Sequence, residues 1–238
     1  MLLWGLYIDP LYIVLFIATL VISGAAQFFI RSQFGKYSAV RNGAGLSGLQ
    51  VGERLGETLR FSDASSTGPT RVSFKIVAGN LSDHFDPRTK EVGLSEQVAQ
   101  RDSVAAMAVT AHEVGHAQQD AEGTVAMSAR AFLVPAVTYS PMASYALIFI
   151  GLIFNLTGLF WLGIIVFGVM VVFSILTLPV EIGASRRALV MLRENGLLQT
   201  VEEEAGVKRV LTAAAMTYVA AAVTSILTLL YYISIARR

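Results

Sequence analysis

The run His112-Glu113-Val114-Gly115-His116 has the residue types and the spacing that can bind a catalytic metal. Residues four apart lie on the same face of a helix, so the imidazoles of His112 and His116 can reach one ion. Glu113 lies about 100° further around such a helix, where it can approach a water molecule on that ion. Zinc lowers the pKa of such a water to about 7, and a nearby glutamate can accept its proton. The pattern therefore predicts a hydrolytic zinc site.

The residues around this motif disfavour the alternative of two histidines on a helix without a metal. The motif follows the run SVAAMAVTA, and the pattern from Glu96 to about Gln119 predicts a helix whose middle is unusually apolar. Such a helix is largely buried, and a buried His-Glu-His group without a ligand costs free energy. We therefore expect the helix to carry a metal ion.

A catalytic zinc site usually takes three protein ligands and keeps one position open. The chain has three histidines and no cysteine, which excludes disulfides, thiolate ligands and a thiol nucleophile. We favour Glu181 as the third ligand. It follows Leu178-Pro179-Val180 at the end of an apolar segment, where a charge is costly unless it has a partner. The weaker alternative is His84, which requires a hairpin to fold over the helix.

The composition is that of a membrane protein. Hydrophobic residues make up 54% of the 238 residues and charged residues 15%, whereas soluble domains have about 25% charged residues. The net charge is only +1, so no overall field attracts nucleic acid. We expect a lipid bilayer among the partners of the chain, and no nucleic acid.

Four segments are long and apolar enough to span a bilayer, which takes about 20 residues. The first covers about 11–30. A signal peptide is the alternative there, but Asp9 stands where a basic region is expected, so we predict a retained helix. Residues 131–178 contain no Lys, Arg, Asp or Glu and fit two spans joined by the turn NLTG. The fourth span runs from about 210 to 235.

Positive charges gather in the two loops that these spans leave on one side of the membrane. Of the 18 Lys and Arg residues, 11 lie in 31–130 and five in 181–210. Because loops rich in Lys and Arg stay inside, we expect a multi-pass protein of the cell membrane with a cytoplasmic catalytic face. The expected parts are a first span (1–30), a catalytic region (31–130), two spans (131–178), the third-ligand helix with a connector (179–210) and a last span (211–238).

The loop before the HEVGH helix contains patterns of a short helix and a small sheet. A capping box opens a helix over 47–55, and the run DASSTGPT at 63–70 predicts a break. Alternating apolar residues predict a strand over 72–76. Segments 81–85 and 91–94 flank the turn DPRT and predict a β-hairpin. The expected fold is a predominantly α-helical membrane protein with four spans and a zincin-like catalytic region that contains a small hairpin or sheet.

Several motifs together resemble the YugP-like membrane zinc metallopeptidases. They span nearly the whole chain: FGKYS at 34–38, GLSG at 45–48, LSDHFDPR at 81–88, HEVGH at 112–116, LPVE at 178–181, ASRRAL at 184–189 and LTAAAMTYVA at 211–220. The resemblance implies a gluzincin-type zinc metalloendopeptidase. It implies that His112, His116 and Glu181 bind zinc and that Glu113 is the general base and acid.

The resemblance also implies a support for one ligand. The helix that carries Glu181 is similar, more distantly, to the E-x-x-A-D helix of HtpX-like and CaaX-type membrane peptidases, in which the aspartate supports a ligating histidine. Ser185 stands at that position here, so a hydroxyl would provide the support. After the glutamate the family often has a pair such as Phe-Asp, where this chain has Ile182-Gly183.

Substrate contacts are expected from the hairpin, which in related peptidases precedes the zinc helix. An extended peptide can add to such an edge as a further strand. His84 could donate to the substrate oxyanion or could instead hold the hairpin turn. The candidate substrate-binding residues are Asp83, His84, Phe85 and Asp86. Tyr218, early in the last span, is a candidate electrophile, although an aromatic residue there also fits partitioning at the membrane interface.

The sequence thus predicts a membrane-embedded zinc metallopeptidase that acts on a peptide or a membrane-protein substrate. The alternative is a zinc-stabilised membrane scaffold or adaptor without turnover, which has no need of Glu113. A transporter is disfavoured because the spans hold almost no ionisable residue. We make no prediction of the oligomeric state.

Overall fold

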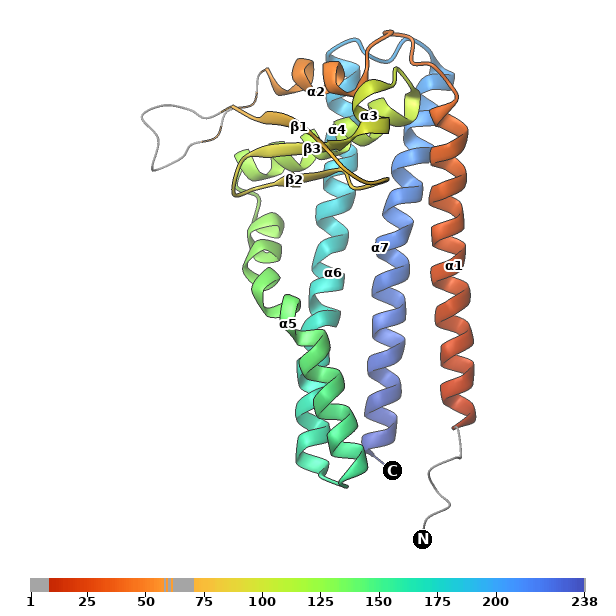
Figure 1. The fold of residues 1–238 in the computed structure, drawn as a ribbon, viewed down its shortest axis with the longest axis vertical. Helices are drawn as coiled ribbons and strands as arrows, with labels where there is room; N and C mark the ends of the chain where they lie inside the picture. The colour runs from red at the N-terminus through yellow and green to blue at the C-terminus, as the bar shows by residue number, and fades with distance from the viewer. Residues whose placement is uncertain (1–8, 58, 60, 62–70, 238) are drawn as a thin grey trace. The chain divides into compact units, whose positions relative to one another are not determined.

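The computed structural model describes residues 9–57, 59, 61 and 71–237, which form seven helices and three strands (Figure 1). The break predicted at 63–70 lies outside the described residues. The elements in chain order are α1 (Pro10–Ser38), α2 (Gly48–Gly56), β1 (Ser73–Val77), β2 (His84–Asp86), β3 (Glu91–Ser95), α3 (Glu96–Gln100), α4 (Val104–Ala121), α5 (Val125–Ile153), α6 (Thr157–Glu194) and α7 (Val201–Ala236).

Four of these helices, α1, α5, α6 and α7, are long and apolar enough to cross a membrane. Large apolar side chains on them are exposed, such as Phe28 and Phe132, and a bilayer would solvate these side chains where water would not. The prediction of a predominantly helical membrane protein with four spans is confirmed.

One helix differs from its prediction. Residues from 179 were expected to begin a separate helix, but α6 continues from the apolar span through Pro179 to Glu194. Proline removes one backbone donor and usually kinks or ends a helix. Membrane helices tolerate it because packing, hydroxyl side chains and local adjustment compensate. Glu181 therefore lies on the same helix as the third span.

The described residues group into two compact units. The first consists of the described parts of Met1–Gln27, Ala129–Thr177 and Thr217–Arg238, and it holds the apolar helical segments. The second consists of Phe28–Ser128 and Leu178–Met216. This second unit contains the sheet, the HEVGH helix and Glu181, so all residues predicted to bind the metal belong to one compact body.

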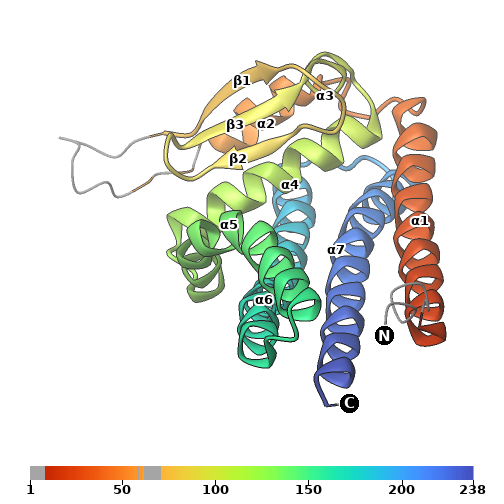
Figure 2. The ribbon, with the colours of Figure 1, turned by 60° about the horizontal axis from the view of Figure 1, so that its bottom comes forward.

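The sheet of the second unit has the strand order β1-β3-β2. The central strand β3 pairs antiparallel with β2, which confirms the predicted hairpin, and parallel with β1, which confirms the strand at 72–76. Val92 and Leu94 on β3 are fully buried. Figure 2 shows the sheet lying over α4, with β2 at one edge on the side of α4. An edge strand thus lies along the helix that carries His112 and His116.

The helix predicted from 96 to 119 is in fact two helices. α3 ends at Gln100, and Arg101 adopts an extended conformation. Ser103 then caps α4, because its Oγ accepts a hydrogen bond from the backbone N–H of Ala106. The continuous prediction was wrong at this point, although the element that carries the HEVGH motif is a helix as expected.

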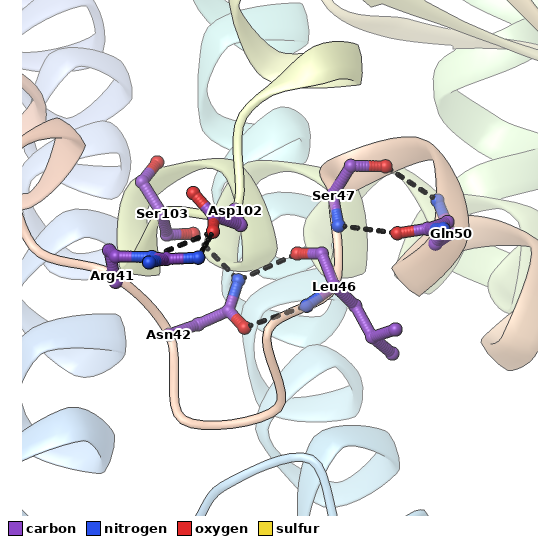
Figure 3. A network of polar contacts seen from close by, with 7 residues as sticks. All are labelled: Arg41, Asn42, Leu46, Ser47, Gln50, Asp102 and Ser103. Atoms are coloured by element: carbon purple, nitrogen blue, oxygen red, sulfur yellow. Dashed lines mark hydrogen bonds and ion pairs between the residues drawn. The ribbon is translucent and has the colours of Figure 1, made fainter.

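A network of polar contacts explains the break (Figure 3). The backbone N–H of Asn42 donates to the carbonyl of Asp102, and the Asn42 amide donates to the carbonyls of Leu46 and Ser103. The guanidinium of Arg41 donates from Nε to the Asp102 carboxylate at 2.8 Å. These tertiary contacts hold 101–103 in an extended form. Figure 3 also shows the capping box that opens α2, as the sequence predicts.

α4 forms the centre of the core of the second unit. Its alanine side chains from Ala105 to Ala117 are almost completely buried, as are Met107 and Val114. They pack with residues of α2, α3, β3 and the parts of α6 and α7 within the same unit. Because the α4 residues are small, neighbouring elements can approach its backbone closely.

Candidate metal centre

Helices α4 and α6 bring together the three side chains that were predicted to bind zinc. Nε2 of His112 lies 3.1 Å from Oε2 of Glu181, and Nε2 of His116 lies 3.4 Å from the same oxygen. All three residues are buried. Ligand atoms about 2.1 Å from a tetrahedral zinc ion are about 3.4 Å apart. The two measured distances are close to this value, and the three residues form a group that could hold a metal ion.

Small residues allow the two helices to approach at this point. A Cβ atom added at Gly115 would lie 2.5 Å from the carbonyl oxygen of Ala184, so any side chain at 115 would push α6 away. Gly115 lies between the two histidines in sequence, and Ala184 lies one helical turn after Glu181. The contact sets the distance between the helices at the position of His112, His116 and Glu181.

The imidazole rings are oriented through their other nitrogen atoms. Nδ1 of His112 lies 3.2 Å from Oγ of Ser185, and Nδ1 of His116 lies 3.0 Å from Oε1 of Gln119. With a proton on each Nδ1, both Nε2 atoms present a lone pair towards Glu181. The structure thus places the Ser185 hydroxyl beside His112, and its role as the support of a metal ligand stays a prediction.

Gln119 is a residue near the metal centre that the sequence did not identify. Its side chain is almost completely buried, and its Nε2 donates to the backbone carbonyl of Val180 at 2.8 Å. It follows His116 by three residues, a spacing that places two side chains on one face of a helix. The H-x-x-Q spacing was the available signal.

Glu113 is buried on α4, directly after His112. Burial raises the pKa of its carboxyl group to about 7; the charges of Glu181 and Asp83 also raise this pKa, while those of His112 and His84 lower it. A carboxyl group with a pKa near 7 can both accept and donate a proton near neutral pH. The strand β2, which begins at His84, contacts α4, the helix that carries Glu113.

Most of the predicted substrate-binding residues make contacts within the hairpin region. The carboxylate of Asp83 accepts hydrogen bonds from the backbone N–H and the hydroxyl of Ser95, and burial raises its pKa. Phe85 packs on the core and stacks with Phe61 at 6.2 Å between ring centroids. Asp86 accepts from the backbone N–H of Arg88 in the turn, which lowers the pKa of its carboxyl group. These contacts shape the edge strand.

His84 is the exposed member of this set. Its Nδ1 lies 2.8 Å from the carbonyl oxygen of Ser82. Its cross-strand partner is Gly93, where an added Cβ would lie 2.7 Å from Cε1 of the His84 ring. The missing side chain at 93 leaves room for the ring to lie across β3.

Tyr218 belongs to the first compact unit, whereas the metal centre lies in the second. Its role as an electrophile stays a prediction.

Comparisons with known proteins agree with this geometry. A family model described as "Putative neutral zinc metallopeptidase" matches residues 12–237. The chain is 39% identical over 225 residues to the "Putative membrane protease YugP" of Bacillus subtilis (strain 168). That alignment covers 94% of this chain and 96% of the relative. No solved structure matches the chain significantly. The chain, with four apolar helices and a His-His-Glu group that could hold a metal ion, therefore belongs to the neutral zinc metallopeptidase family of these comparisons.

Proposed function

We propose that this chain is a membrane-embedded zinc metalloendopeptidase whose active centre lies between α4 and α6. The observation that carries the proposal is that Nε2 of His112 and Nε2 of His116 each lie within 3.4 Å of one carboxylate oxygen of Glu181. The helix of the two histidines also carries the buried Glu113. His112, His116 and Glu181 would hold zinc and leave one coordination position for the reaction. When bound, zinc supplies a Lewis acid that polarises the peptide carbonyl and activates water.

Glu113 is the proton-transfer group in this proposal. It accepts a proton from the attacking water and passes it to the leaving amine. Burial raises the pKa of its carboxyl group in the metal-free chain, and a bound zinc ion would favour the ionised form that accepts the proton. Ser185 orients the ring of His112 and does not take part in the proton transfer.

The edge strand β2 would hold the substrate. An extended peptide can pair with such an edge through its backbone, as a further strand of the sheet. His84 is exposed on this strand. If its Nδ1–H donates to Ser82, its Nε2 can donate to a substrate oxyanion only when the ring is a cation. In its neutral form, His84 would accept a hydrogen bond from a substrate N–H.

The function is tested by removing and restoring the metal. The full chain, purified in detergent micelles and loaded with Zn²⁺, is expected to cleave an unfolded casein probe at internal bonds. 1,10-Phenanthroline should abolish the cleavage and added Zn²⁺ should restore it, because the proposed reaction requires the ion. Mass spectrometry of the fragments checks that the bonds are internal. A chain that retains no zinc, or cleavage that is insensitive to the chelator, contradicts the proposal.

We also propose that the catalytic region faces the cytoplasm, as the distribution of Lys and Arg favours. The chain has no cysteine, so an introduced cysteine is its only thiol. Gln100→Cys marks the exposed end of α3, and Thr157→Cys marks the exposed start of α6. In intact cells a membrane-impermeant maleimide is expected to label the variant at 157 and not the variant at 100. Permeabilised cells should give labelling of both, and the reverse pattern in intact cells would place the catalytic region outside.

A further inference from the structure

We infer that Gln119 is a positioning residue that joins the two halves of the metal centre, by orienting His116 and by docking the turn of α6 that carries Glu181. This inference rests on the proposed zinc peptidase function. Oε1 of Gln119 lies 3.0 Å from Nδ1 of His116, and its Nε2 donates to the Val180 carbonyl at 2.8 Å. Only 2% of the residue is exposed, so water does not compete with either contact.

The hydrogen bonds at the oxygen and the nitrogen of the Gln119 amide allow only one orientation of this group. Oε1 can only accept a hydrogen bond, so it selects the His116 tautomer with a proton on Nδ1 and leaves the lone pair of Nε2 for a metal. The opposite orientation of the amide would place Oε1 against the Val180 carbonyl, where two acceptors repel each other. Since Val180 directly precedes Glu181, the same side chain fixes one ligand on α4 and the backbone next to another on α6.

Gly183 provides the space that this arrangement needs. A Cβ atom added there would lie 2.7 Å from Nε2 of Gln119, which is too close for an unchanged amide. The other atoms near that position are further away, the nearest being a guanidinium nitrogen of Arg187 at 3.4 Å. A methyl group at 183 would therefore displace the end of a flexible side chain and leave the backbone of α6 in place.

These contacts give two independent variants for a test. Gln119→Ala removes the amide, and Gly183→Ala displaces it without changing Gln119 or any ligand. We expect each variant to raise the dissociation constant for Zn²⁺ by about 10- to 100-fold, the range for residues that support a metal ligand. The constant is measured on the full chain in micelles by competition with a chromophoric chelator.

The double variant Gln119→Ala/Gly183→Ala should bind Zn²⁺ as Gln119→Ala does, because the added methyl then has no amide to displace. Visible absorption of bound Co²⁺ reports the ligand geometry, and both single variants should change this spectrum. Two matched controls are expected to behave as the wild type. Gln118→Ala makes the same change one residue earlier, and Gly168→Ala adds a methyl on α6 where nothing lies within 4 Å.

The outcomes separate the inference from the proposed function. If the wild type and Gln119→Ala bind Zn²⁺ equally and give the same Co²⁺ spectrum, Gln119 has no positioning role, even if the variant melts at a lower temperature. Additive effects of the two substitutions would also overturn the inference, since Gly183 would then act without Gln119. If the wild type itself binds no Zn²⁺, the proposed function fails first.

Discussion

Glu113→Gln is expected to bind zinc as tightly as the wild type and to lose peptide hydrolysis. The glutamine side chain has nearly the size of the glutamate, but its amide cannot accept a proton from water at neutral pH. General acid–base catalysis contributes about 10²- to 10⁴-fold to a rate, so kcat should fall by at least that factor. The measurement is casein cleavage by the zinc-loaded variant, with the bound zinc quantified on the same sample.

The fold should tolerate this substitution. Burial already raises the pKa of Glu113 to about 7 because the ionised form is poorly solvated there. A neutral amide avoids this cost, so the metal-free variant should melt no lower than the wild type. Glu96→Gln makes the same change at an exposed position on α3 and should leave both zinc binding and cleavage unchanged.

The result also decides between the enzyme and the zinc-stabilised scaffold. A variant that cleaves as fast as the wild type would show that Glu113 is not the base. If the wild type binds zinc but neither protein cleaves membrane-derived peptides or casein, the scaffold is favoured. The enzyme is supported only by zinc binding in both proteins together with cleavage by the wild type alone.

Local patterns in the sequence predicted much of this architecture. The i, i+4 spacing of His112 and His116, the capping box of α2 and the hairpin around the DPRT turn depend on residues within one turn or one loop. Such features can be predicted from neighbouring residues alone, because the contacts that form them are short-range. The position of Glu181 could be anticipated because two predicted spans separate it from the HEVGH helix, and an even number of spans returns the chain to the same side of a membrane.

Features that depend on distant partners were not predictable in this way. The break before α4 arises because the side chain and backbone of Asn42 bind 102 and 103, about 60 residues away. The contact between Gln119 and Val180 joins residues 61 apart. A helical pattern at 96–119 cannot reveal either contact, because a single sequence does not show which loop lies beside a given backbone segment.

Glu181→Ala is expected to have the largest effect on metal binding. Glu181 is 2% exposed and is the only acidic member of the described ligand group. Without its carboxylate, two neutral imidazoles would have to hold a dication in a buried site. Zinc affinity should fall by more than the factor of about 100 that marks the upper range for supporting residues. The chelator competition assay measures this loss directly.

Loss of this ligand should also remove the stabilisation that zinc gives to the folded chain. Free zinc at about 1,000 times its dissociation constant stabilises a protein by about 4 kcal/mol. The wild type should therefore melt at a higher temperature with zinc than without it. Glu181→Ala should show a much smaller increase at the same zinc concentration, because a 100-fold weaker affinity leaves at most about 1.4 kcal/mol of this stabilisation. Glu194→Ala, an exposed glutamate on the same helix, serves as the control and should keep the zinc-dependent increase.

The same measurement on His84→Ala tests the alternative third ligand. Nδ1 of His84 is already engaged by the Ser82 carbonyl, and the residue is exposed on the edge strand. Oε2 of Glu181, in contrast, lies within 3.4 Å of both histidine Nε2 atoms. His84→Ala should therefore keep wild-type zinc affinity. If His84→Ala lost zinc while Glu181→Ala retained it, the third ligand would lie on β2, and α6 would support the site without binding the metal.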